Sequence, residues 1–202
     1  YFEPKLNRWE WQRAHIFEIV EDLYTQSYVL PYLVPMLENA GANVLLPRER
    51  DCQTAEIIID NDGCLNTNST YTEHTADKVW LQGTGKGFAH LRPQYIDFEN
   101  PFKEGTFRIA ETVKKGKEST AEWIPEIPQN GQYAVYVSYQ TVPNSSDDAL
   151  YTVYHKGGVS QFKVNQKMGG GTWVYLGTFG FDAGKSNACK VTLSNRSAKA
   201  GQ

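Results

Sequence analysis

The sequence of 202 residues contains few cysteines, no long apolar run and little net charge. Three cysteines do not form a disulfide framework: Cys52 and Cys64 could pair across a short loop, which would leave Cys189 over. No stretch approaches the roughly 20 apolar residues that a membrane-spanning helix requires, so we predict no membrane span. The net charge of −3 argues against a nucleic-acid partner, because proteins bind phosphate backbones through basic side chains.

The chain also begins without an initiator methionine and without a signal-peptide pattern. We therefore expect it to be part of a longer protein. Its 202 residues suffice for one large or two small domains. Its 12 Tyr and 5 Trp are usual for extracytoplasmic β domains and sugar binders, and they are also ordinary strand composition.

The first half of the chain carries a helix–strand pattern over residues 8–51. Apolar residues recur at helical spacing on one side, and Gly41 stands where such a helix would end. Pro31 and Pro35 interrupt the pattern. It therefore predicts a first helix to about Tyr24, a bend or restart, and a second helix that ends near Gly41.

A short apolar stretch, Asn43 to Leu46, predicts a buried strand after the helices. With them it would form one unit of an open α/β sheet, and Arg48 to Asp51 would emerge at the carboxyl end of the strand, where such sheets bind ligands. Glu56 to Asp60 could be a second strand or a short helix, because periodicity cannot decide over so few residues. Asp60-Asn61-Asp62-Gly63 predicts a turn; it superficially resembles a calcium loop but lacks the glutamate that such a loop needs.

The character of the sequence changes near residue 100. Beyond it, strands alternate with turns, without intervening helices. The expected strands lie around residues 107–113, 132–141, 149–156, 159–166, 172–181 and 190–193. Gly157-Gly158 predicts a hairpin between two of them. This pattern predicts an antiparallel β-sandwich or jelly roll, with a boundary between residues 1–100 and 102–202.

The second half resembles a domain found at the end of golvesin-like proteins and in xanthan lyases, which is described as similar to a carbohydrate-binding module. The resemblance rests on Ala121-Glu122-Trp123-Ile124-Pro125, Gly131-Gln132-Tyr133-Ala134-Val135-Tyr136, Asp148-Ala149-Leu150-Tyr151, His155-Lys156-Gly157-Gly158, Asn165-Gln166 and Gly171-Thr172-Trp173-Val174-Tyr175-Leu176-Gly177-Thr178-Phe179. It covers roughly residues 102–202. It implies a β-sandwich and a polysaccharide partner.

The first half resembles part of a zinc-dependent N-acetylmuramoyl-L-alanine amidase that carries the golvesin-like domain as an insertion. The residues that carry this resemblance are Val20-Glu21-Asp22-Leu23, Leu37-Glu38-Asn39-Ala40-Gly41-Ala42-Asn43-Val44 and Pro47-Arg48-Glu49-Arg50-Asp51. By position Glu21 matches a zinc ligand of the family, although Glu18 or Asp22 could take its place. The resemblance implies two histidine ligands and a catalytic glutamate that this sequence lacks, so we expect one zinc ligand of the three that a catalytic site needs.

Each candidate in the first half has a second interpretation. Glu21 on an apolar helix face could be a zinc ligand, or it could be a carboxylate paired with Arg13, Arg48 or Arg50. Arg48 and Arg50 could bind the carboxylate of a peptide stem, because arginine makes bidentate contacts to carboxylates, or they could be a solvated strand end.

Aromatic residues of the second half could form a sugar-stacking platform. The candidates are Trp123, Tyr136, Tyr139, Tyr151, Trp173 and Tyr175. Half of the residues in an alternating strand must face the core. We expect Trp123 and Trp173 to be core residues.

The sequence thus predicts an α/β amidase-like segment followed by an all-β antiparallel sandwich, in the periplasm or outside the cell. The complete protein would cleave the amide between N-acetylmuramic acid and L-alanine in peptidoglycan with zinc, and this chain alone would be inactive. The alternative is a non-catalytic module that binds polysaccharide, including an accessory domain of a polysaccharide lyase.

Overall fold

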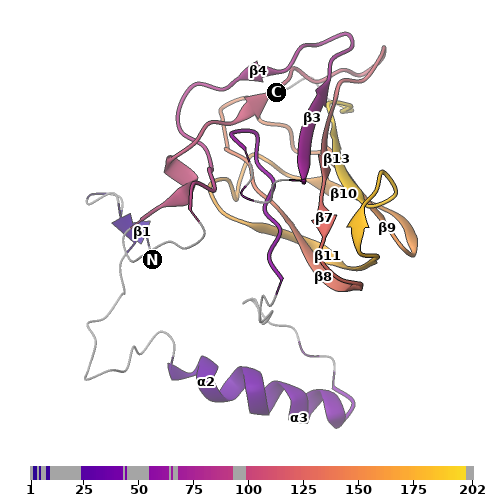
Figure 1. The fold of residues 1–202 in the computed structure, drawn as a ribbon. Coiled ribbons are helices and arrows are strands. Elements are labelled where there is room, and N and C mark those ends of the chain that lie inside the picture. Colours follow the sequence, from indigo (N-terminus) through magenta and orange to yellow (C-terminus); the bar gives the residue numbers. More distant parts are fainter. Residues whose placement is uncertain are drawn as a thin grey trace. The chain divides into compact units, whose positions relative to one another are not determined.

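The computed structural model describes residues 2–3, 5, 8–9, 24–42, 44, 55–63, 65, 68–92 and 99–198. The chain divides into two compact units, Tyr1–Thr54 with Ile96–Glu99 and Ala55–Tyr95 with Asn100–Gln202. We call them the N-terminal unit and the β unit and describe each by itself (Figure 1). No helix among the described residues is long and apolar enough to cross a membrane.

The described part of the N-terminal unit is mainly one helical run. It consists of α2 (Gln26–Tyr28), the π-helical turn η1 (Val29–Leu33) and α3 (Val34–Asn39). Pro31 lies inside the π turn and Pro35 lies in the first turn of α3, where a missing N–H costs little. The interruption expected at the two prolines therefore takes the form of a π-helical turn.

Gly41 ends this run as the sequence predicts. Its φ of 87° is left-handed, a conformation that costs glycine little. The Gly41 N–H donates to the Glu38 carbonyl at 2.9 Å, and the Ala42 N–H donates to the Leu37 carbonyl at 3.0 Å. These two bonds form a Schellman motif, which satisfies carbonyls that the end of the helix leaves open.

Other predictions for the first half are only partly covered by the described residues. Arg8–Trp9, expected to open the helical segment, instead form β2, which pairs with β1 (Phe2–Glu3). Tryptophan favours strands, and this preference agrees with the pairing. The first helix and most of the strand expected at residues 43–46 lie outside the described residues.

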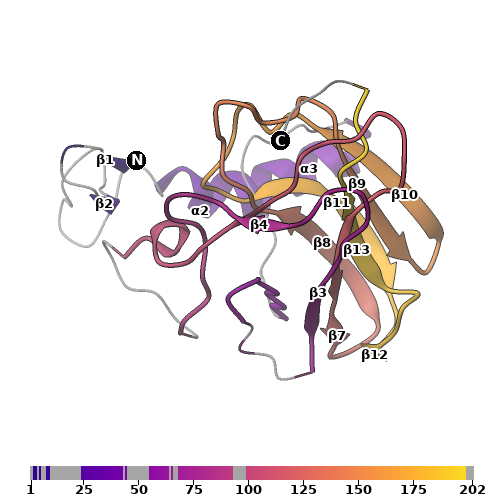
Figure 2. The same ribbon diagram turned by 90° about the horizontal axis from the view of Figure 1, so that it is seen from above.

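The β unit is built on a five-stranded antiparallel sheet with strand order β10-β9-β13-β6-β3 (Figures 1 and 2). Its strands are β3 (Thr70–His74), β6 (Thr120–Ile124), β9 (Ala149–His155), β10 (Gly158–Val164) and β13 (Lys190–Ser194). The β9–β10 hairpin predicted from the glycine pair is confirmed: Gly158 pairs with His155 and has a φ of 123°.

A second layer covers one face of this sheet. It is the pair β8 (Gly131–Val137) and β11 (Val174–Phe181), whose register shifts between Tyr175 and Gly177. Apolar side chains from both layers form the interior, which includes the fully buried Val153 of β9 and the 4%-exposed Phe181 of β11. Two sheets that pack through alternate residues make a β-sandwich, as expected for this half.

Shorter elements complete the β unit. They are β4 (Leu81–Gln82), which pairs with β5 (Arg108–Ile109), β7 (Glu126–Ile127), which pairs with β12 (Gly184–Lys185), and the 3₁₀ helix η2 (Pro101–Lys103). The stretch Glu56 to Asp60 was predicted as a strand or a short helix. Its residues 56–59 form neither. The turn predicted at Asp60 to Gly63 is present, with Asp60 and Gly63 forming a β-bridge.

The compact β unit extends beyond the boundary that we expected near residue 100. Residues 55–92 belong to it, because β3 is the fifth strand of the main sheet and β4 pairs with β5. Trp80, in the same segment, packs with Ala110 and Ala121 in a small apolar cluster. The segment that we assigned to the first half is therefore an edge of the sandwich.

A buried asparagine ties the end of β13 to the rest of the β unit. Asn195 is 5% exposed. Its Oδ1 accepts from the Ser119 N–H and its Nδ2 donates to the Glu111 carbonyl, both at 2.8 Å. Nearby, the Ser197 hydroxyl donates to Asp148, whose pKa this bond and other hydrogen bonds lower to about 2.

Candidate functional site

The strand register places two polar side chains on the inner face of the sheet, at its edge. Partner residues on β3, β6, β13 and β9 form the two rows Tyr71, Trp123, Val191, Val153 and Glu73, Ala121, Leu193, Tyr151. Both rows are apolar until β3, where the second one ends in Glu73. A carboxylate in this position needs partners, because burial of an unpaired charge is costly.

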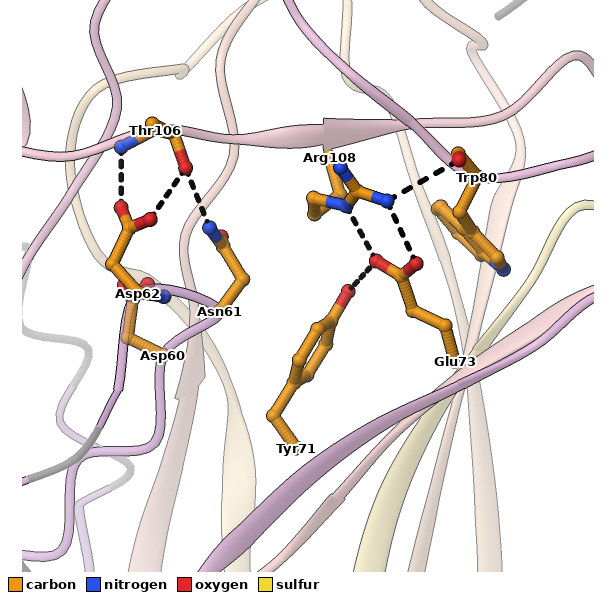
Figure 3. A network of polar contacts seen from close by, with 8 residues as sticks. All are labelled: Asp60, Asn61, Asp62, Tyr71, Glu73, Trp80, Thr106 and Arg108. Carbon is orange, nitrogen blue, oxygen red and sulfur yellow. Dashed lines mark hydrogen bonds and ion pairs between the residues drawn. The ribbon is translucent and has the colours of Figure 1, made fainter.

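Arg108 of β5 supplies most of those partners (Figure 3). Its Nε donates to Glu73 Oε1 at 2.6 Å and its Nη2 donates to Glu73 Oε2 at 2.9 Å, so the ion pair is bidentate. Nη2 also donates to the Trp80 carbonyl at 3.2 Å, and the Tyr71 hydroxyl donates to Glu73 Oε1 at 2.6 Å. The two charged side chains are only 19% (Glu73) and 28% (Arg108) exposed.

This arrangement fixes the protonation of the group. Burial opposes ionisation of Glu73, but the hydrogen bonds from Arg108 and Tyr71 outweigh it, so the pKa of Glu73 lies below its usual value. The hydrogen bonds to Glu73 raise the pKa of Arg108. Burial, followed by the bond to Glu73, raises the pKa of the Tyr71 hydroxyl. The group is therefore one anion, one cation and one neutral hydroxyl at neutral pH.

The turn at residues 60–63 lies beside this group, and Thr106 holds it there. Asp62 Oδ2 accepts from the Thr106 N–H at 2.5 Å, and Asp62 Oδ1 accepts from the Thr106 hydroxyl at 2.6 Å. Asn61 Nδ2 donates to the same hydroxyl at 2.8 Å. Asp60 Oδ1 accepts from the Asp62 N–H at 3.0 Å, and burial raises the pKa of Asp60 to about 6.

Together these residues line an open, polar depression of about 410 Å³. Its lining consists of Asn61, Asp62, Tyr71, Thr72, Glu73, Gln82, Thr106 and Arg108. The volume falls within the roughly 300–1,000 Å³ of common ligand sites. Carboxylates, amides and a guanidinium side by side offer acceptors and donors, so the depression can hold a ligand rich in hydroxyl groups.

Neither a zinc centre nor the calcium loop considered from the sequence has a donor set in the described part of the chain. No group of three or more His, Cys, Asp or Glu among the described residues could hold a metal ion. Both oxygens of Asp62 instead accept hydrogen bonds from Thr106. His74, the histidine next to Glu73 in sequence, lies 3.6 Å from a Glu122 carboxylate oxygen.

The aromatic residues proposed as a stacking platform do not gather in one place. Tyr151 is buried in the core. Trp123, expected in the core, is half-buried and lies with its ring centroid 5.3 Å from that of Tyr71. Trp173, also expected in the core, is 39% exposed, and its ring meets those of Phe88 and Phe102 edge-on. The expectation for Trp173 was wrong. Trp173 precedes β11, so the alternation of inward and outward side chains along that strand does not apply to it.

Two of the proposed platform residues do form an aromatic pair. Tyr136 of β8 and Tyr175 of β11 are cross-strand partners, with ring centroids 5.3 Å apart. Tyr175 is 54% exposed, and its hydroxyl is 2.7 Å from the Thr178 hydroxyl. The Tyr136 hydroxyl is buried, so only Tyr175 of the pair offers an exposed ring.

The residues predicted as the metal and substrate site lie outside the described residues. These are Glu21, Arg48 and Arg50, and the same holds for the possible Cys52–Cys64 pair. Cys189 is a buried free cysteine. The sequence did not predict the depression, although the alternation over Thr70 to His74 is typical of a strand.

The antiparallel pairing and the polar depression define the β unit as a β-sandwich module with a recess beside an edge strand. Residues 101–202 match the Golvesin C-terminal domain, and because this match covers half of the chain, the chain belongs to that family. The resemblance predicted for the second half is thereby confirmed. Six of the eight residues that line the depression precede the matched region; only Thr106 and Arg108 lie inside it.

Two similar proteins are xanthan lyases. One, from Bacillus sp. (strain GL1), is 35% identical over 81 residues, which cover 40% of this chain and 8% of that protein. The other is a solved structure of a Paenibacillus xanthan lyase, with 22% identity and a TM-score of 0.40, over 65% of this chain and 12% of that one. The chain thus spans a small part of the length of these enzymes.

Proposed function

We propose that the β unit recognises polysaccharide and contributes binding rather than catalysis. The depression beside β3 carries this proposal. It combines open access with acceptors and donors held in fixed positions, which is what a sugar's array of hydroxyl groups requires.

Membership of the golvesin family and similarity to xanthan lyases support a polysaccharide as the partner. The name of these relatives denotes an enzyme that acts on a polysaccharide, and the region shared with this chain is a small part of that enzyme. A likeness of this kind suggests an accessory role rather than the lyase reaction. With this partner, we place the protein outside the cell or in the periplasm.

Electrophoresis of the 202-residue chain in native gels that contain polysaccharide tests this function. We expect at least one of xanthan, hydroxyethylcellulose and mannan to slow the chain relative to bovine serum albumin. Sedimentation with purified peptidoglycan tests the further polysaccharide named from the sequence. If the chain migrates unchanged in every gel and stays in the supernatant, polysaccharide recognition is refuted.

A zinc-dependent amidase is the second proposal, for the N-terminal unit as part of a complete enzyme. It rests on the sequence motifs around Glu21, Gly41 and residues 47–51. The Schellman end at Gly41 agrees with the helix–glycine part of that pattern, which many helices share. The described residues do not supply a zinc donor set.

The corresponding prediction is that the purified chain does not cleave peptidoglycan. One carboxylate such as Glu21 does not make a zinc site, which needs three protein ligands and an open position. Release of dye from labelled peptidoglycan, with added zinc, measures the reaction. Release that a chelator abolishes would contradict the prediction and favour the amidase over a pure binding role.

A further inference from the structure

We propose that the depression beside β3 accepts an uncharged sugar unit and rejects a uronate, and that residues 55–92 give the chain this preference. The proposal rests on the polysaccharide recognition proposed above and specifies its site and its ligand class. It concerns a part of the β unit that the family match mostly leaves out.

The first support is the balance of charge in the lining. Two carboxylates, Asp62 and Glu73, face one guanidinium, that of Arg108. Arg108 already donates two hydrogen bonds to Glu73 and one to the Trp80 carbonyl. A ligand carboxylate would therefore meet a cation whose charge is neutralised and an Asp62 carboxylate that repels it.

The second support is the set of groups that remain available to a ligand. Among the described residues, the side-chain amide of Gln82 and the Nη1 of Arg108 have no hydrogen-bond partner. The two residues are cross-strand partners on β4 and β5. Asp62 accepts two hydrogen bonds, whereas a carboxylate offers about four acceptor sites. These groups provide donors and acceptors together, as neighbouring sugar hydroxyls require.

A purely structural role explains part of this group but not all of it. Tyr71, Glu73 and Arg108 hold β5 against β3 through their mutual hydrogen bonds (Figure 3). The Gln82 side chain forms no hydrogen bond with any described residue and is exposed, so it contributes nothing to that attachment. Gln82 therefore separates a binding role of the depression from a structural one.

The experiment measures affinities of the 202-residue chain by calorimetry for uncharged and acidic oligosaccharides of equal length. The uncharged probes are cellohexaose, mannohexaose and N-acetylchitohexaose, and the acidic probe is hexagalacturonate. We expect at least one uncharged probe to bind at least about tenfold more tightly than hexagalacturonate. Its affinity should change by less than about twofold between low and high salt, because no net charge is paired on binding.

Three variants locate the effect and test its dependence on charge. Gln82→Ala should lower the affinity for the uncharged probe by about three- to tenfold, the loss expected for one hydrogen bond. Gln161→Ala removes a matched exposed glutamine from β10, at the opposite edge of the sheet, and should leave the affinity unchanged. Asp62→Asn should raise the affinity for hexagalacturonate, relative to that for the uncharged probe, by at least about threefold.

The outcomes separate this proposal from the function on which it rests. Equal or tighter binding of hexagalacturonate overturns the charge preference and leaves polysaccharide recognition standing. If Gln82→Ala weakens binding no more than Gln161→Ala does, the ligand binds elsewhere and the proposed site is overturned. If none of the four oligosaccharides binds, the preference is overturned as well. If the chain also shows no retardation in the gels and does not sediment with peptidoglycan, polysaccharide recognition is refuted too.

Discussion

The inner face of the main sheet is held in two different ways at its two ends. Toward β9 the rows reach Val153 and Tyr151, which are almost fully buried and face the apolar side chains of β8 and β11. On the edge strand β10 they continue to Ser160 and Phe162. Toward β3 a row ends in Glu73, held by Arg108 and Tyr71. One end thus depends on apolar area and close packing, and the other on directed, charge-assisted bonds.

This difference has a consequence for function. An apolar interior tolerates little change of shape, and it offers no group to a polar ligand. A hydrogen-bonded edge leaves lone pairs and N–H groups near the surface, where a ligand can reach them. We therefore expect mutations to damage the apolar end through packing and the polar end through unpaired charge.

The largest expected effect belongs to the apolar end. Phe181→Ala should lower the free energy of unfolding by about 3–5 kcal/mol, because it removes a buried ring and leaves a cavity. Urea denaturation followed by near-UV circular dichroism measures the change. The exposed Val159 of β10 is the control, since Val159→Ala should stay within about 0.5 kcal/mol. Similar losses in both variants would show that the sandwich interior is not packed as described.

The next effect tests the polar end. Arg108→Met should cost about 2–3 kcal/mol, less than a fully buried pair, because Glu73 keeps its charge but loses its cation in a largely enclosed position. The double variant Glu73→Gln with Arg108→Met removes the stranded charge and keeps an acceptor for Tyr71, so it should regain part of this loss. Equal stability of the single and double variants would contradict a role for charge at this end.

The smallest effect has the opposite sign. The pKa of Asp60 is raised from 3.8 to about 6, so the folded state binds more protons than the unfolded state between these values, and stability falls as pH rises through this window. Asp60→Asn should therefore stabilise the chain by about 1–2 kcal/mol at pH 7.5, less than the roughly 3 kcal/mol for two pKa units, because a neutral amide accepts a weaker bond from Asp62.

The difference between Asp60→Asn and the unmodified chain should vanish below about pH 4, where Asp60 is protonated in both states. Thermal unfolding at several pH values measures it. Asp182→Asn is the control: the Asp182 side chain is 55% exposed and pairs at the surface with Lys156 at 2.7 Å, so its loss should change stability by no more than about 0.5 kcal/mol. A destabilised Asp60→Asn at pH 7.5 would refute the assignment of a raised pKa.

The regular parts of the β unit could be predicted from the sequence because their signals are local. Alternation over Gly131 to Val137 and the glycine pair at 157–158 fix a strand and a hairpin from neighbouring residues alone. Gly41 likewise predicts the end of its helix from the local sequence. Each of these features depends on residues within a few positions along the chain.

The depression could not be predicted because it depends on partners far apart in sequence. Glu73 and Arg108 are 35 residues apart, and Asp62 and Thr106 are 44 apart. Nothing in the polar stretch Thr70 to His74 shows that it joins a sheet whose other strands begin at residue 120. The same reason explains why the boundary near residue 100 left residues 55–92 with the wrong half.

The buried Asn195 restricts how the protein can be produced. Asn195-Arg196-Ser197 is an acceptor sequence for N-linked glycosylation. A glycan on Asn195 would displace the bonds to Ser119 and Glu111 from an enclosed site. Removal of the acceptor sequence through Ser197→Ala would break the bond to Asp148 instead. An expression host without this modification therefore suits the fold better than a eukaryotic secretory pathway.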